Sequence, residues 1–429
     1  MLINIDFKLE EGGALTSRSK HFNFTNPGPI PEDLTYVPGF IDGMMNWTMI
    51  RSPSPNRTLA FAGALAMLAH LSGRTYTDES GTRTNLYVIA LAPTGSGKES
   101  PRNANNILAK SLGISESIME SVASGEALED ELVKMPSMLL QSDEIATLFG
   151  QMRGHGRMSR ALSSRLRTLF TSSGGVYIPR KKANSGATGA KIVNPHLTIF
   201  GTGVSEELLD DLTPQEIRNG LFGRCIILTA EDENLRRPAI AFEKPQKHLT
   251  DEAGYLANLE YGNRGNAPSH FVALEDDAVK EARKQVMDFF GRQRRMLAEA
   301  DMKNAHAIVA RIDEKVAKLA LLYAISANPY SPRVSVEGVE WAAQFASYVV
   351  KWMLYEAQFH VAEGKFGKLM EHAKSFISKK GGSVIRRDLF RGLHCDEATF
   401  KRLIKALLLA EEIEQPEMID GNVTYSLVK

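Results

Sequence analysis

The chain has 429 residues, of which 43% are apolar and 24% are charged, values typical of a globular protein with several domains. Basic and acidic residues both number 51, so the net charge indicates no partner, and any nucleic-acid surface must come from local clusters of charge. The two cysteines, Cys225 and Cys395, exclude a disulfide framework, disfavour a cysteine-based metal site and favour a cytoplasmic location. Residues 1–6 lack the pattern of a signal peptide and the apolar run 59–71 is too short to span a bilayer, so no membrane partner is expected.

The chain divides into four regions by its residue patterns. Residues 1 to about 55 are rich in proline, glycine and asparagine, which favours a loosely structured arm, and the apolar residues 59–69 predict a packed helix. Short apolar runs alternate with helical segments between residues 86 and 229, which indicates a largely parallel sheet flanked by helices. Residues 250–358 have a helical pattern, and the last part predicts helices followed by two strands. We therefore expect an α/β protein with regions at 1–75, 76–245, 246–360 and 361–429.

A glycine-rich loop follows the first buried strand of the expected sheet. The strand covers residues 86–91, the loop covers residues 92–98, and a helix is expected over residues 100–110. This order is the context that a phosphate-binding loop needs, because glycines let backbone N–H groups approach phosphate and a helix N-terminus attracts negative charge. Lys98 is expected to reach the β- and γ-phosphates of ATP. The predicted nucleotide-binding residues are Pro93, Thr94, Gly95, Ser96, Gly97, Lys98, Glu99 and Ser100.

Two positions depart from the usual pattern of such a loop. Ala92 replaces the first glycine, and Glu99 replaces the hydroxyl that normally binds Mg²⁺. The Glu99 carboxylate can itself ligate Mg²⁺, but it adds negative charge beside the phosphates. Ser100 is the alternative ligand if the helix begins one residue later. A glycine turn with a surface lysine is the alternative interpretation of the whole motif.

An acidic pair ends a second apolar strand, and a threonine ends a third. Asp143 and Glu144 follow the run 138–142, and at the carboxyl edge of a parallel sheet they would lie beside the loop. Asp143 is predicted to hold Mg²⁺, and Glu144 is predicted to orient and polarise the attacking water. The alternative is a helix N-cap followed by an acidic first turn. Thr202, in the run 197–203, is placed either to bond the γ-phosphate or the water, or to cap the next helix.

Arg224 precedes another apolar strand, where an arginine is either a solvated edge residue or, in an oligomeric ATPase, a group that reaches a neighbour's γ-phosphate. With the loop, the acidic pair and Thr202 in this order, residues 31–353 resemble a family of phage and mobile-element P-loop proteins known mainly as a domain of unknown function. More distantly, they are similar to AAA+ replicative helicases of the minichromosome-maintenance type. The other segments that carry the resemblance are 222–227, 310–320 with Arg311, and 334–339.

The resemblance implies a P-loop AAA+-like ATPase core with a helical lid, which forms a homo-oligomer, expected to be a hexamer. It gives Arg224 the role of an arginine finger toward the neighbouring subunit, matches Arg311 to the arginine of the second sensor, and makes Thr202 the polar sensor. It also implies a β-hairpin between the acidic pair and Thr202 that tracks DNA in a central channel. ATP and Mg²⁺ are the cofactors that it implies.

Two basic regions are predicted to contact DNA. Residues 176–179 and 190–193 fit hairpin arms around a basic, glycine-rich tip, which suits phosphate contacts without base reading, and an ordinary solvated loop is the alternative. Residues 366–429 predict a winged-helix domain whose third helix is basic, although such domains also dock on proteins. The predicted DNA-binding residues are Arg180, Lys181, Lys182, Lys191, Lys401, Arg402 and Lys405.

These patterns lead to three hypotheses of function. The first is an oligomeric ATP-dependent DNA helicase or replication-initiation ATPase of a phage or mobile element, which would also contact replication proteins. The second, favoured by Glu99, is a nucleotide-gated DNA-binding protein that does not hydrolyse ATP. The third is a helicase loader whose winged helix docks on a partner. DNA-stimulated turnover separates the first from the second, and strand separation by the purified protein separates the first from the third.

Overall fold

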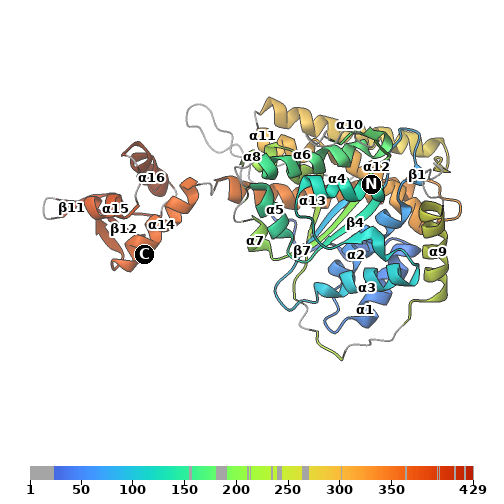
Figure 1. The fold of residues 1–429 in the computed structure, drawn as a ribbon. Coiled ribbons are helices and arrows are strands. Elements are labelled where there is room, and N and C mark those ends of the chain that lie inside the picture. Colours follow the sequence, from blue (N-terminus) through green and yellow to red (C-terminus); the bar gives the residue numbers. More distant parts are fainter. Residues whose placement is uncertain are drawn as a thin grey trace, which may run out of the picture. The chain divides into compact units, whose positions relative to one another are not determined.

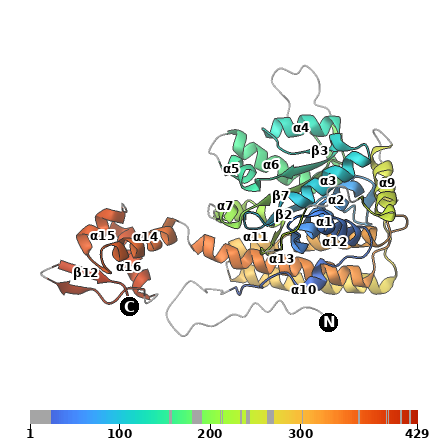
Figure 2. The same cartoon turned by 90° about the horizontal axis from the view of Figure 1, so that it is seen from below.

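The structure is a computed structural model that forms two compact units, Met1–Ala357 and Gln358–Lys429. Within the first unit, a sheet is enclosed by helices (Figures 1 and 2). None of the helices in the described part of the chain combines the length and apolar character needed to cross a membrane. The described residues are 24–153, 157–179, 191–209, 212, 214–232, 235–238, 244–262, 270–300, 302–362, 365–393, 395, 397–409, 412–419 and 422–428.

The core of the first unit is a five-stranded sheet in which every pair of neighbouring strands is parallel. The strand order is β3-β4-β7-β2-β8. Nearly all side chains of the strands β2, β4, β7 and β8 are buried, because helices cover both faces of the sheet. The prediction of an α/β protein with a parallel sheet is therefore confirmed. The strands are β2 (Tyr87–Leu91), β3 (Ile118–Met119), β4 (Ser137–Ser142), β7 (His196–Gly203) and β8 (Cys225–Thr229).

Two sets of helices cover the faces of this sheet, as Figure 1 shows for α4 and α6 on one side and α1 to α3 on the other. The first set is α4 (Gly125–Lys134), α5 (Ile145–Arg153) and α6 (Arg157–Thr171). The second set is α1 (Phe40–Arg51), α2 (Arg57–Ser72), α3 (Glu99–Ser111) and α9 (Lys247–Tyr261). Helix α2 packs on the sheet and also beneath α1, α3 and α9, so it is buried all round, as its apolar sequence predicts.

The remaining elements of the first unit are mostly the helices expected between residues 250 and 358. These are α10 (Asp277–Glu299), α11 (Lys303–Val309), α12 (Ile312–Ala327) and α13 (Val336–Ala362). The short elements are η1 (Glu32–Thr35), β1 (Tyr76–Thr77), η2 (Ser115–Ser117), η3 (Ser172–Gly174), β5 (Val176–Tyr177), β6 (Ile192–Val193), α7 (Ser205–Leu209), α8 (Pro214–Arg218), η4 (Phe222–Arg224) and β9 (His270–Phe271). Strands β5 and β6 pair antiparallel and form the base of the expected hairpin.

The prediction of a loosely structured arm over residues 1–55 is wrong for the helix α1. The proline-rich segment before this helix is held against α12, where the Ser326 hydroxyl donates a hydrogen bond to Pro38 O and accepts one from Ile41 N. Gly39 lies between them with φ of +82°, and a Cβ at this position would clash with the Ser326 carbonyl oxygen. The glycine therefore permits a close approach that lets α1 begin at once.

Two lysines of α12 are buried in the first unit. Lys318 Nζ donates to Asn85 Oδ1 at 2.6 Å and to Arg83 O at 3.1 Å, beside the amino end of β2. Lys315 Nζ lies 3.8 Å from the sulfur of Met353. Burial lowers the pKa of both lysines to about 8. Two oxygen acceptors thus compensate the Lys318 ammonium for its removal from water, whereas the Lys315 ammonium has a thioether as its partner.

We expect Lys315→Met to raise the free energy of unfolding at pH 7 by about 1–2 kcal/mol, because it removes a buried charge whose partner is a thioether. Lys318→Met should lower it by about 1–3 kcal/mol, because two oxygen acceptors lose their donor. The folded protein releases the Lys315 proton above about pH 8, whereas the unfolded chain keeps it to a higher pH. The free energy of unfolding of the wild type therefore rises above about pH 8. The difference between Lys315→Met and the wild type becomes smaller over the same pH range. Thermal unfolding at several pH values checks this, and a destabilised Lys315→Met variant would contradict it.

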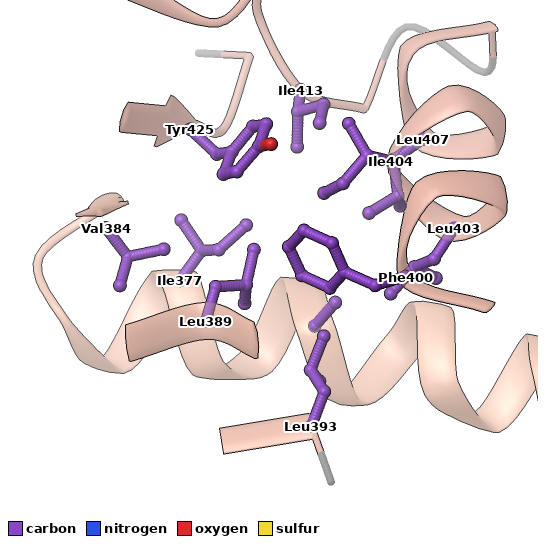
Figure 3. Packing of buried hydrophobic residues seen from close by; sticks show 11 residues of the cluster. Ile377, Val384, Leu389, Leu393, Phe400, Leu403, Ile404, Leu407, Ile413 and Tyr425 are labelled. Carbon is purple, nitrogen blue, oxygen red and sulfur yellow. The ribbon is translucent and has the colours of Figure 1, made fainter. Parts of the chain in front are cut away.

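The second unit combines three helices with a three-stranded antiparallel sheet in the order β10-β12-β11. Figure 3 shows side chains from α14, α15, α16 and the strands pointing toward one another around Phe400. Strands β11 and β12 form the terminal hairpin, and Ile413 adds an isolated antiparallel bridge with Leu427. The elements are α14 (Lys365–Lys379), β10 (Ser383–Ile385), α15 (Arg386–Leu393), α16 (Glu397–Leu409), β11 (Glu417–Ile419) and β12 (Asn422–Ser426).

Candidate nucleotide site

The glycine-rich loop lies between β2 and α3, as predicted from the sequence. Gly95 and Gly97 have φ of +83° and +85°, which L side chains rarely adopt. Ser96 is buried and its hydroxyl donates to Pro93 O at 2.9 Å, which closes the turn. Lys98 is half-buried and donates from Nζ to Ala92 O at 3.1 Å, across the loop. The loop thus has the open backbone and the single lysine that a phosphate site needs.

A segment after α1 packs against this loop. A Cβ at Gly97 would clash with the Ser54 carbonyl oxygen, so this glycine is required for close contact as well as for its φ. The hydroxyls of Ser52 and Ser100 lie 2.8 Å apart. Helix α3 begins at Glu99, one residue before the predicted start, and the Glu99 side chain is exposed. Of the two candidate Mg²⁺ ligands in this turn, Ser100 therefore already has a hydroxyl partner, whereas Glu99 faces solvent.

The acidic pair and Thr202 lie at the same edge of the sheet. Strand β4 ends just before Asp143, and β7 lies between β4 and β2. The Thr202 hydroxyl lies 3.0 Å from Asp143 O and 3.3 Å from Asp143 Oδ1. A Cβ at Gly201 would stand 2.5 Å from Ile145, so the absence of a side chain there lets the start of α5 approach β7. The structure thus brings the acidic pair and the threonine together.

Arg102 forms an ion pair with Asp143, the carboxylate that the sequence predicts as an Mg²⁺ ligand. Its Nη2 lies 2.6 Å from Asp143 Oδ1, and its side chain is mostly buried while that of Asp143 is mostly exposed. Arg102 lies on α3, one helical turn after Lys98 at the N-cap of this helix, so the two cations share a helix face. Sequence reasoning missed this arginine, although its spacing from Lys98 is a signal that could have identified it. A cation at Asp143 must therefore replace or accompany Arg102.

Glu144 immediately precedes α5 and is exposed. Its Oε2 accepts a hydrogen bond from the Thr147 hydroxyl at 3.3 Å. This contact is of the kind expected for an acidic residue at a helix N-terminus, which was the alternative interpretation from the sequence. The same location leaves the carboxylate facing solvent beside Asp143, where a water molecule can reach it. Both roles remain compatible with its position.

The donor set suits a magnesium–nucleotide complex better than a metal bound by protein alone. Among the described residues, no group of three or more histidine, cysteine or acidic side chains is arranged to hold a metal ion. Magnesium usually keeps several waters and takes one or two carboxylates together with substrate phosphates. Asp143 and the turn that contains Glu99 and Ser100 offer such partial ligation next to the loop.

Arg224 and Arg311 lie at the opposite edge of the sheet. Arg224 precedes β8, whose register pairs Tyr87 with Cys225 and Leu91 with Thr229. Its own chain's phosphate loop follows the other end of β2, and a strand of this length spans about 13 Å. Arg224 therefore lies far from its own loop.

These two arginines line a basic cavity of about 540 Å³. The Arg224 side chain is buried, and its Nη1 donates to Gly220 O at 2.7 Å. Its Nε is also buried and has no hydrogen-bond partner in the described part of the chain. Burial and the nearby charge of Arg311 lower the pKa of Arg224. The ionisable groups that line the cavity are Arg167, Arg218, Arg224, His306 and Arg311.

The predicted DNA-binding residues are only partly described. Arg180, Lys181 and Lys182, at the hairpin tip, lie outside the described residues, as does the side chain of Arg402. Lys191, just before β6, is exposed. On α16, Lys401 and Lys405 are exposed, and Lys401 Nζ lies 3.7 Å from a Glu397 carboxylate oxygen.

The chain matches no protein-family model, and a search of curated proteins finds no significant similarity. Functional inference therefore depends on the arrangement of the residues themselves.

Lys98→Ala should reduce nucleotide affinity by at least about 100-fold, because the loop loses the cation that its own backbone cannot replace. Calorimetry with a non-hydrolysable ATP analogue and Mg²⁺ measures this change. Lys110→Ala, in the last turn of the same helix, is the matched control and should bind like the wild type. Equal affinity of the Lys98→Ala variant and the wild type would remove the loop from nucleotide binding.

Proposed function

We propose that this protein is an ATP-driven, oligomeric DNA motor, acting as a helicase or a replication-initiation ATPase of a phage or mobile element. The observation that carries the proposal is the convergence of Lys98, Asp143 and Thr202 at one edge of a parallel sheet. Crevices outside the carboxyl ends of parallel strands are where such folds bind their ligands. The AAA+-like resemblance of residues 31–353 is in keeping with this arrangement.

Each residue at this edge has a distinct role in the proposed reaction. The loop N–H groups and Lys98 hold the phosphates of ATP, and the helix dipole of α3 adds to this attraction. Asp143 holds Mg²⁺, which supplies charge neutralisation at the phosphates. Glu144 orients and polarises the attacking water, and Thr202 bonds the γ-phosphate or that water. Thr202 also fixes Asp143 through its hydroxyl, so it links the residue that holds Mg²⁺ to the γ-phosphate.

The hairpin is the proposed DNA-contacting element. At its base, Tyr177 donates a hydrogen bond of 2.5 Å to Glu129, which also lies 2.9 Å from Arg165 Nε. This buried network ties β5 to α4 and α6, the helices that cover one face of the sheet. A change at the sheet edge can therefore reach the hairpin through packed elements.

The second unit supports the same proposal less directly. Its order of helix, strand, two helices and two strands suits a winged helix, with α16 as the third helix. Lys401 and Lys405 are exposed on that helix, four residues apart, and can contact DNA phosphates. We propose that this unit captures DNA or a replication partner, while the first unit hydrolyses ATP.

A non-hydrolysing, nucleotide-gated DNA-binding protein is the second candidate. The ion pair between Arg102 and Asp143 favours it, because the carboxylate expected to hold Mg²⁺ is already neutralised. The exposed Glu99 adds negative charge in the same turn. Under this alternative, ATP binds but is not turned over.

Glu144→Gln should keep ATP bound but slow its hydrolysis by about 10²–10⁴-fold, because orientation of the water is lost while the phosphate contacts remain. Nucleotide affinity and phosphate release measured on the same preparation separate the two effects. Glu116→Gln, an exposed residue of η2, is the control and should hydrolyse ATP normally. Normal turnover in Glu144→Gln would reduce Glu144 to a helix-terminal residue, and no turnover in the wild type would favour the second candidate.

A ring is part of the proposed mechanism because of where Arg224 lies. It cannot reach the phosphates of its own chain, whereas its side chain lines a basic cavity suited to anions. A head-to-tail contact between copies would bring this cavity to the neighbour's phosphate loop. Each hydrolysis site would then contain Lys98 of one subunit and Arg224 of the next.

Mixing two inactive variants tests this arrangement. Lys98→Ala and Arg224→Ala should each lack ATPase activity alone, yet an equal mixture should regain activity, because about a quarter of its interfaces contain both intact residues. The control is a mixture of Lys98→Ala with the double variant, which offers no intact interface and should remain inactive. Full activity of Arg224→Ala alone would show that no neighbour's arginine is needed.

A further inference from the structure

The segment after β8 returns past the phosphate loop. Arg237 anchors it: its backbone N–H donates to Pro53 O at 2.9 Å and its Nε donates to Ser52 O at 3.0 Å. Its Nη2 also donates to the carbonyl oxygens of Met49 and Ile50. These acceptors belong to the end of α1 and the segment that touches Gly97. The backbone at residues 236 and 237 is thus fixed beside the loop.

Arg236 is directed toward the loop from this anchored position. A Cβ at Gly95 would stand 4.0 Å from Arg236 Nη2, so the guanidinium lies next to the middle of the loop. The side chain is about half exposed, at 49%. Its two terminal nitrogens form a bidentate pair with Asp232, at 3.1 Å and 2.9 Å. A planar cation therefore stands beside the phosphate loop and is held by a carboxylate.

We infer that Arg236 is a second phosphate-binding cation of the same chain, held by Asp232 until the nucleotide arrives. The inference rests on the proposed nucleotide site and adds to it a residue that contacts the polyphosphate beside Gly95. On binding, the guanidinium exchanges the Asp232 carboxylate for phosphate oxygens. Asp232 is thereby a competitor of the ligand.

The exchange is favourable for two reasons. An exposed arginine–carboxylate pair four residues apart contributes little to stability, so little is lost when it opens. The polyphosphate carries more negative charge than one carboxylate and offers oxygens that match the two parallel N–H groups of the guanidinium. The anchoring of Arg237 means that only the Arg236 side chain must move.

Two variants of opposite effect test the inference. Calorimetry with a non-hydrolysable ATP analogue and Mg²⁺ is performed on the full chain. Arg236→Ala should weaken affinity by roughly 10- to 100-fold, the effect of losing a hydrogen-bonded charge on the ligand. Asp232→Asn should strengthen affinity several-fold, because the arginine loses its competing partner. The opposite signs exclude simple misfolding as the cause.

An equivalent exposed pair elsewhere provides the control. Lys247 and Asp251 form a pair with the same spacing on α9, and Lys247→Ala and Asp251→Asn should leave affinity unchanged. Wild-type affinity in Arg236→Ala, with binding still lost in Lys98→Ala, would overturn this inference alone. Weaker binding in Asp232→Asn would overturn the exchange. A wild type that binds no nucleotide would overturn both the inference and the proposed function.

Discussion

Parallel pairing of β2 with β7 and of β7 with β4 is the constraint on which the candidate site depends. Parallel strands end at the same edge, so the loop after β2, Thr202 in β7 and the acidic pair after β4 must meet there. Glycines at two positions then allow closer contact than other residues would: Gly97 against Ser54 and Gly201 against Ile145. The hydrogen bond between Thr202 and Asp143 follows from this geometry.

The same constraint separates two groups of positive charge. At the carboxyl edge, the loop ends in Lys98 and has two arginines beside it, Arg102 and Arg236. Each arginine is held there by a carboxylate. At the amino edge, Arg224 and Arg311 line a basic cavity, and Arg224 Nε has no hydrogen-bond partner among the described residues. One chain thus presents two anion-attracting regions that cannot serve one bound nucleotide together. In the proposed ring, a nucleotide between two subunits would meet both.

The sequence predicted those parts of this arrangement that depend on neighbouring residues. The strand, loop and helix around Lys98, the strand before Asp143 and the strand that contains Thr202 follow from local patterns, and each is present in the structure. Arg236 could not be predicted, because its place beside Gly95 depends on how Arg237 packs against α1. The burial of Lys315 and Lys318 could not be predicted, because helical periodicity does not show which groups of other elements will contact them: Met353 for Lys315, and Arg83 and Asn85 for Lys318. For the same reason, the pattern gave no sign that Arg102 would engage Asp143.

Phosphate release by the purified full chain, with Mg²⁺ and ATP and with or without single-stranded DNA, tests the central claim most directly. The proposed motor requires hydrolysis that depends on Lys98 and becomes faster when DNA is added, because the hairpin transmits DNA binding to the sheet edge. Hydrolysis that is no faster than that of the Lys98→Ala variant, with or without DNA, would contradict the claim.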